Sequence, residues 1–121
     1  MRKTVGDAIN EARGELKDVN EGSFTYSHED MARYCGEAVV EMRRVRPSTR
    51  YDANMNLYSD DDEWATLGPG ASGETLPLES RYYAAIPAFI IARCLSRDIT
   101  DETNLQVASI WMGKFSQIAA G

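Results

Sequence analysis

Residues 27–47 read SHEDMARYCGEAVVEMRRVRP and carry the most regular hydrophobic pattern in the chain. Their apolar side chains recur every three or four positions, which places them on one face of a helix. Ser27 can cap the first turn, and Pro47 disfavours helical geometry at the residue before it. The stretch therefore predicts an amphipathic helix around which the other elements pack. Its expected buried face consists of Met31, Tyr34, Cys35, Ala38, Met42 and Val45.

The length and composition of the chain indicate one globular domain. A chain of 121 residues is typical of a single domain, which we expect over residues 1–121, and its 43% apolar and 26% charged residues are ordinary for a globular protein. The longest apolar run, residues 82–92, is far shorter than the ~20 residues that a membrane span needs. The first residues also lack the apolar core of a signal peptide. We therefore expect no membrane association, and a location in the cytoplasm of the producing cell.

The charge and the cysteines narrow the possible partners and cofactors. A net charge of −6 disfavours binding to the phosphates of nucleic acid, so no sequence-specific DNA or RNA binding is expected. Cys35 and Cys94 each lie within an apolar helical pattern, with no second cysteine nearby. This arrangement fits neither a zinc site nor a redox CxxC motif. It predicts buried, reduced thiols and no metal or other cofactor.

Three further helices are predicted, over residues 5–17, 79–97 and 101–119. Thr4 followed by Asp7 is typical of a capping box at the start of the first of these helices, and Thr100 is a candidate cap for the last. Pro87 lies within the predicted helix 79–97, where it must either kink the helix or begin a new helical segment.

Residues 48–78 have no helical periodicity. They contain turn-forming residues throughout, an acidic run at residues 60–63 that is most simply a solvated turn, and the glycine-rich stretch GPGASG. Alternation at residues 55–58 and 75–78 allows two short strands. The expected fold is therefore all-α, a small bundle of about four helices with an irregular or short β-hairpin arm inserted between the second and third helices.

Several motifs that would indicate chemistry are absent or incomplete. Residues 18–29 resemble a calcium loop superficially, but Ser23 stands where the sharp turn needs glycine. We interpret this segment as a turn from which Phe24 and Tyr26 fold back onto the core. His28 is expected to have a surface or capping role. The chain contains no nucleophile elbow, zinc-protease motif, P-loop or dinucleotide fingerprint, so no catalytic residue and no enzyme activity are predicted.

The arginines that follow the apolar helix are the best candidates for binding a partner. Cations at a helix C-terminus complement the helix dipole, and that role alone can explain the cluster. The alternative is a contact patch, because arginine and aromatic side chains often dominate interfaces. On this hypothesis the arginines act together with large side chains of the arm. The predicted partner-binding residues are Arg43, Arg44, Arg46, Arg50, Tyr58, Trp64 and Leu67.

The order of these signals resembles the small head–tail adaptor proteins of tailed bacteriophages, which are also called connector or head-completion proteins. That family has an N-terminal helix of the form V-x-D-x-I-x-x-A-R-x-x-L, and residues 5–16 match it. After a turn, the family has a second helix that closes on arginine and proline, as Arg46 and Pro47 do here. The stretch LPLESRYYAAIPAFIIARCLSRD is similar to the family's Leu-Pro turn and buried helix, and Phe115 to a phenylalanine near the end of its last helix. Tyr34 and Gly36 depart from the tryptophan and asparagine that are common in the family.

The resemblance implies a structural virion protein, assembled in the host cytoplasm and located at the neck or tail of the phage. Such adaptors form a ring, usually of twelve copies, between the portal protein and the tail or nozzle proteins. Double-stranded DNA passes through the channel without being read. The residues alone leave two other classes open: a monomeric helical accessory or regulatory protein that binds one partner, and an enzyme subunit whose chemistry lies in another chain.

Overall fold

The computed structural model describes residues 3–17, 26–52, 54–58, 61–97 and 102–121. Five α-helices lie in this part of the chain, with three short 3-10 helices between them. The α-helices are α1 (Val5–Leu16), α2 (His28–Val45), α3 (Asp61–Ala65), α4 (Ala85–Ser96) and α5 (Glu102–Ala120), and the 3-10 helices are η1 (Pro47–Arg50), η2 (Pro69–Ala71) and η3 (Ser80–Tyr82). The described residues form no strand, only isolated bridges between Thr4 and Thr75 and between Tyr51 and Leu57. The all-α prediction is confirmed, but the structure does not show a β-hairpin arm.

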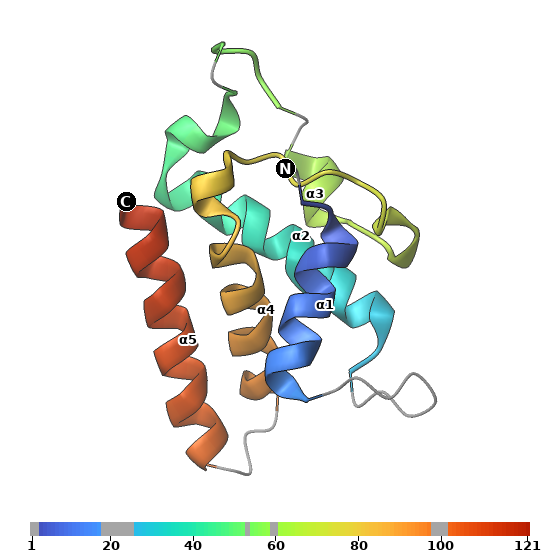
Figure 1. Ribbon diagram of the computed structural model, residues 1–121, viewed down its shortest axis with the longest axis vertical. Coiled ribbons are helices and arrows are strands. Elements are labelled where there is room, and N and C mark those ends of the chain that lie inside the picture. Colours follow the sequence, from blue (N-terminus) through green and yellow to red (C-terminus); the bar gives the residue numbers. More distant parts are fainter. Residues whose placement is uncertain (1–2, 18–25, 53, 59–60, 98–101) are drawn as a thin grey trace.

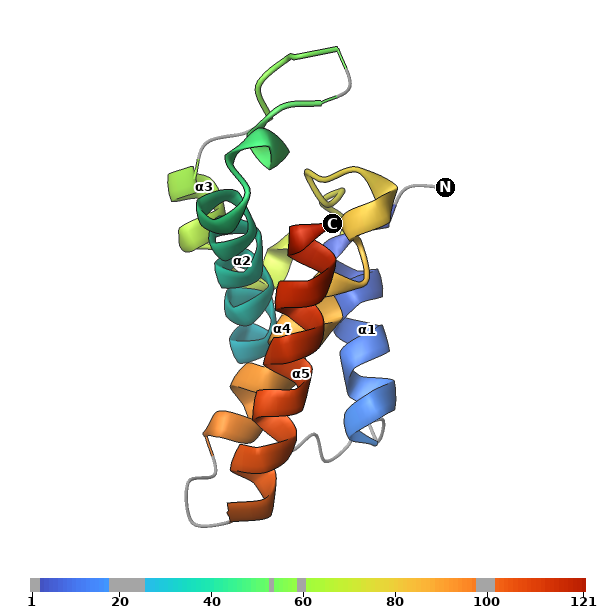
Figure 2. The ribbon, with the colours of Figure 1, turned by 90° about the vertical axis from the view of Figure 1, so that its left-hand side faces the viewer.

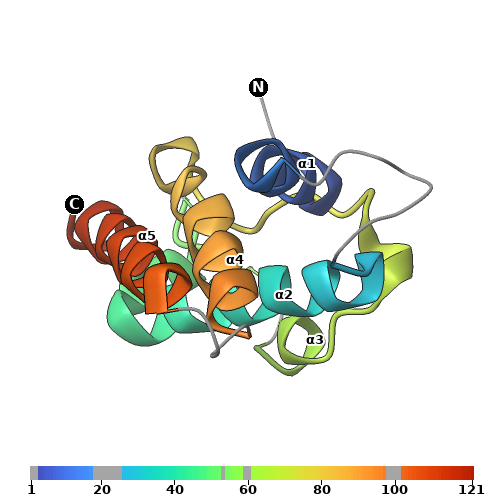
Figure 3. The ribbon, with the colours of Figure 1, turned by 90° about the horizontal axis from the view of Figure 1, so that it is seen from below.

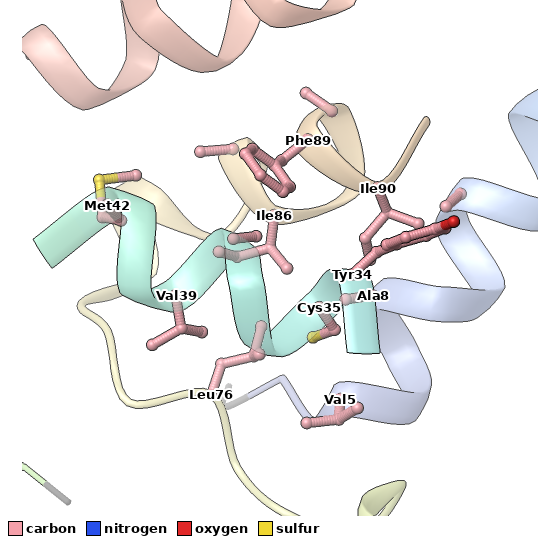
Figure 4. Close-up of a cluster of buried hydrophobic side chains, with 14 of the residues drawn as sticks. Val5, Ala8, Tyr34, Cys35, Val39, Met42, Leu76, Ile86, Phe89 and Ile90 are labelled. Atoms are coloured by element: carbon pink, nitrogen blue, oxygen red, sulfur yellow. The ribbon is translucent and has the colours of Figure 1, made fainter. Parts of the chain in front are cut away.

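Helix α4 is the central element of the bundle. It packs against α5, α2 and α1, and α2 also contacts α1, α3, η1 and η2 (Figures 1 and 3). The hydrophobic core of the described residues is drawn from all five α-helices. In Figure 4, side chains of α1, α2 and α4 lie around Leu76, which comes from the irregular segment between α3 and α4. Phe89 of α4 and Phe115 of α5 pack with ring centroids 5.3 Å apart. These contacts account for the near-complete burial of α4.

The helix ends follow the local signals in the sequence. The Thr4 hydroxyl accepts a hydrogen bond from the Asp7 amide at 3.2 Å, and the Asp7 carboxylate accepts one from the Thr4 amide at 3.0 Å, so the capping box is confirmed. The Ser27 hydroxyl accepts a hydrogen bond from the Asp30 amide at 3.1 Å, as predicted. Each cap satisfies backbone donors that the first turn of a helix leaves without an intrahelical partner.

Pro87 separates the predicted helix 79–97 into two elements. The 3-10 helix η3 covers its start, and α4 begins at Ala85, so that Pro87 lies in the first turn of α4. Proline is tolerated there because the first-turn amides have no intrahelical acceptor. Of the two outcomes expected for Pro87, the structure has the new helical segment. The predicted cap Thr100 and most of the calcium-like segment, residues 18–25, lie outside the described residues; Tyr26 is partly buried against the core.

The two cysteines are buried and free, as predicted from their apolar patterns. Cys94 Sγ lies 3.3 Å from Met31 Sδ in the interface between α4 and α2. Burial raises the pKa of the Cys35 thiol to about 12, because the surrounding apolar groups do not solvate a thiolate. The folded chain therefore keeps this proton to a much higher pH than an unfolded chain would.

Part of the expected arm belongs to the core, which corrects the interpretation of residues 48–78. Residues 61–63 of the acidic run, which was expected to be a solvated turn, instead form the start of α3, and Trp64 of α3 is only 3% exposed. The next residues are tied to the start of α1, where the Val5 amide donates to the Glu74 carbonyl at 2.8 Å and the Leu76 amide to the Lys3 carbonyl at 2.9 Å. The second half of the segment is thus a docked layer, and the expectation that it forms an uncovered arm is wrong.

A glycine of α2 makes the docking of α3 possible. A Cβ added at Gly36 would collide with the Trp64 carbonyl oxygen and would lie 3.0 Å from the Leu67 Cβ. Only a residue without a side chain allows the backbone of α3 to approach α2 this closely. Gly36 therefore has a packing role in this chain.

We predict that Gly36→Ala destabilises the protein by about 1–3 kcal/mol, the usual cost of overpacking a core. The matched control is Gly113→Ala in α5, because a Cβ there would meet no atom within 4 Å. This control should stabilise the fold by about 0.5–1 kcal/mol through the higher helix propensity of alanine. Urea unfolding of both variants measures the two effects, and equal behaviour at the two sites would contradict the close contact.

We also predict that Cys35 makes the stability of the protein fall with rising pH above ~8.5, the pKa of a cysteine in an unfolded chain. Above that pH the unfolded chain releases a proton that the folded chain keeps until about pH 12, so ionisation favours the unfolded state. Cys35→Ala should reduce this pH dependence by up to about 1.4 kcal/mol per pH unit. Urea titrations of the wild type and the variant at several alkaline pH values provide the test, and identical slopes would refute the prediction.

Candidate partner-binding surface

Residues 51–58 form a loop that projects from one end of the bundle, beyond η1 (Figures 1 and 2). Residue 53 lies outside the described residues. The loop is closed at its base by the antiparallel bridge between Tyr51 and Leu57 and by a 2.8 Å hydrogen bond from the Tyr58 amide to the Arg50 carbonyl. The chain thus leaves the bundle and returns to it within a few residues.

Asp52 organises the turn of this loop. Its carboxylate oxygen Oδ1 accepts hydrogen bonds from the Asn54 amide at 2.8 Å and from the Asn56 amide at 2.9 Å. The Met55 amide donates to the Asp52 carbonyl at 3.0 Å, and the Asp52 amide donates to the Asn56 carbonyl at 2.8 Å. Met55 has a φ of 64°, in the left-handed region that residues other than glycine adopt at an energetic cost. These hydrogen bonds hold the turn in a conformation that its residues would not favour alone.

The loop presents apolar side chains to solvent. Met55 is 76% exposed, Leu57 61% and Tyr51 40%, and we call these three residues the apolar tip. A hollow of about 400 Å³ lies beside the tip, between Met55 and the 3-10 helices η1 and η3. A cluster of large apolar groups on a structured loop is typical of a binding surface.

The predicted partner-binding residues occupy different environments in the structure. Arg44 is exposed and pairs with Glu41 one turn earlier, so it remains available at the surface. Arg50 and Tyr58 are half-buried at the base of the loop. Arg43 is 1% exposed within the last turn of α2, and an accessible binding role for this residue is therefore wrong.

Trp64 and Leu67 belong to the layer that packs on α2. Trp64 is buried in the core and Leu67 is partly buried against it. They were expected to be exposed because they lie in a segment without helical periodicity. The five-residue helix α3 is too short to show such a pattern, yet it is long enough to turn Trp64 inward.

Arg46 has a structural position that joins three elements. It follows the last residue of α2, and its Nη1 donates hydrogen bonds to the carbonyls of Ala119 at 3.0 Å and Ala120 at 2.8 Å. Its guanidinium also lies 5.7 Å from the centroid of the Tyr82 ring in η3. A cation here satisfies carbonyls that the end of α5 leaves without intrahelical donors, and it complements the helix dipole. Arg46 thus has the dipole-related role at the end of α5, whereas Arg43 and Arg44 lie in the last turn of α2 itself.

The sequence pattern did not identify the apolar tip as the exposed surface. The alternation at residues 55–58 was the available signal, but it allows a short strand and does not indicate an exposed turn. Val45 was expected on the buried face of α2 and is instead 46% exposed. It is the last residue of the helix, where the chain turns into η1, so the periodic face continues past the elements that cover it.

The described part of the chain offers no other obvious chemistry. Among these residues, no group of three or more histidine, cysteine, aspartate or glutamate side chains is placed to hold a metal ion. None of the helices that the structure describes combines the length and hydrophobicity that a membrane crossing requires. His28 Nε2 lies 2.8 Å from the Ser72 hydroxyl, a contact between α2 and the loop after η2.

Comparisons of the chain with protein-family models, with curated proteins and with solved structures find no match.

We predict that Arg46→Ala destabilises the protein by about 1–3 kcal/mol, because hydrogen bonds to a charged donor contribute roughly that much. Arg44→Ala is the matched control: its guanidinium is exposed and pairs with Glu41 at the surface, so its loss should cost about 0–1 kcal/mol. Urea unfolding gives both values. If Arg44→Ala costs as much as Arg46→Ala, the contact with the end of α5 is not what stabilises the fold.

Proposed function

We propose that this protein is a head–tail adaptor of a tailed bacteriophage, which assembles with copies of itself into a ring and joins the portal to the tail or nozzle proteins. The observation that carries the proposal is the apolar tip, whose Met55 and Leu57 side chains are largely exposed on a turn held by its own hydrogen bonds. The proposal also rests on the resemblance of the first two helices and of the buried helix to that family. By the same resemblance the ring has twelve subunits.

A preorganised apolar loop is well suited to subunit assembly. Burying an exposed Met or Leu side chain contributes about 1.5–3 kcal/mol. Little of this gain is lost to ordering when the loop already has its bound shape. The hydrogen bonds of Asp52 provide that order in the isolated subunit.

The charge of the chain is compatible with a channel through which DNA moves. A net charge of −6 gives a surface that repels phosphates overall, whereas a basic wall would retain DNA by releasing its counterions. In this proposal DNA passes through the ring without sequence-specific contacts. The protein has no catalytic role and belongs to the neck or tail of the virion after assembly in the host cytoplasm.

The proposal predicts that the double variant Met55→Ser/Leu57→Ser loses assembly and keeps its fold. Ile110→Ser is the matched control, since Ile110 is an apolar side chain 60% exposed on α5 and lies outside the tip. Sedimentation velocity and negative-stain electron microscopy should show rings for the wild type and the control. The double variant should require at least a tenfold higher concentration, the equivalent of about 1.4 kcal/mol.

The same measurements are made with the portal protein encoded in the same genome, and the melting temperature of each variant is recorded. A wild-type chain that stays monomeric at high concentration, both alone and with the portal, would refute the adaptor proposal. That outcome would favour a monomeric accessory protein. Full assembly of the double variant would exclude the tip as the assembly surface.

A further inference from the structure

A second hollow lies where the base of the loop 51–58 meets α3 and the docked layer. It has a volume of about 340 Å³ and is open to solvent. Figures 1 and 2 show the loop and α3 at the same end of the bundle. We call this feature the acidic hollow, and its acidic and aromatic lining residues are Asp52, Tyr58, Glu63, Trp64, Glu74 and Tyr83.

The acidic hollow gathers negative charge that the subunit does not pair. Among the described residues that line it, three are acidic and none is basic. Glu63 and Glu74 are exposed, and neither forms an ion pair with another described residue. Asp52 accepts the two amides of the turn with one carboxylate oxygen, Oδ1. A hollow lined by one sign of charge attracts groups of the opposite sign, so this one attracts cations.

The aromatic residues add a second kind of attraction for a cation. Tyr58, Trp64 and Tyr83 line the hollow together with the acids, and the face of an aromatic ring attracts positive charge. Tyr83 is only 8% exposed, yet no described residue forms a hydrogen bond with its hydroxyl. A nearly buried polar group without a partner is unfavourable. A hydrogen-bond donor bound in the hollow would satisfy this hydroxyl.

Arginine is the cation that uses all of these groups. Its guanidinium is flat, so it can stack on an aromatic ring while its edge donates hydrogen bonds to carboxylates and to a phenolic oxygen. A lysine ammonium is a point charge that cannot stack in this way. A metal ion is not favoured, because no three acidic, histidine or cysteine side chains of the described residues are placed to hold one.

The arginine is best supplied by a different protein. The net charge of −6 makes two copies of this chain repel each other, whereas a basic partner is attracted. Several exposed arginines of this chain already pair with a carboxylate of their own subunit, and these are Arg33, Arg44, Arg81, Arg93 and Arg97.

We infer that the acidic hollow binds an arginine side chain that projects from a basic segment of a partner protein. This site goes beyond the adaptor proposal, because it requires no ring and does not use the apolar tip.

An NMR titration of the wild-type chain tests the site. The probe is a tripeptide with blocked ends that carries arginine between two glycines, and the control peptide carries citrulline, which has a similar shape and no charge. The amides of Tyr58, Glu63 and Glu74 and the indole N–H of Trp64 report binding. The arginine peptide should give saturable shifts at these groups in the millimolar range. The citrulline peptide should bind at least tenfold more weakly.

Variants of the lining locate the charge and the hydroxyl. Glu63→Gln/Glu74→Gln should weaken binding of the arginine peptide at least tenfold. The matched control, Glu15→Gln/Glu29→Gln, removes two other exposed acids and should leave the affinity unchanged. Tyr83→Phe should weaken binding about threefold, the loss of one hydrogen bond. It should leave the melting temperature unchanged, because its hydroxyl has no described partner to lose.

Four outcomes would overturn the inference. They are the absence of saturable shifts, shifts confined to residues away from the hollow, equal binding of the two peptides, and an equal loss of binding in Glu15→Gln/Glu29→Gln. Shifts of the same groups that depend on protein concentration without peptide would assign the hollow to a second copy and would also overturn it. Ring formation is measured separately by sedimentation, so a failure here leaves the adaptor proposal standing.

Discussion

The close approach of α3 to α2 is the constraint on which the rest of the structure depends. Because Gly36 has no side chain, the Trp64 carbonyl can lie directly on the helix and Trp64 can enter the core. That contact fixes the start of the layer that continues to Leu76 and to the first turn of α1. It also divides residues 48–78 into a half that is docked on the core and a half that contains the projecting loop of residues 51–58. The apolar tip is exposed because the packing contacts are made by the other half.

The sequence was most informative where interactions between residues close in sequence determine the structure. Hydrophobic periodicity and the side chains of Thr4 and Ser27 predicted α1 and α2 almost to the residue, since caps and amphipathic faces act within a few positions. Proline chemistry left two outcomes for Pro87, a kink or a new helical segment, and the structure has the second. The hydrophobic pattern could not show which apolar residues would be covered by another element of the fold. Val45 and Trp64 were assigned to the wrong environments because tertiary contacts, not spacing, determine whether each is covered.

The candidate site was less predictable than the fold for a related reason. The arginines were recognised as a cluster, but their roles differ: Arg46 binds the end of α5, Arg43 is buried, and Arg44 stays at the surface. Such differences depend on where α5 ends in space, and no local signal in residues 43–50 encodes that position. The tip depends on a side chain, Asp52, that accepts two backbone hydrogen bonds and supports a left-handed methionine. This geometry has no periodic signature.

The hydrogen bonds described for the tip all join residues between Arg50 and Tyr58. In the proposed adaptor, folding of the helical core and recognition by the loop are therefore open to separate selection. Substitutions at the exposed positions of Tyr51, Met55 and Leu57 can change partner preference without a compensating change in the core, provided that Asp52 keeps the turn. A chain built in this way can diverge in specificity faster than in architecture, and an engineer can exchange the loop as a module between its two closing residues.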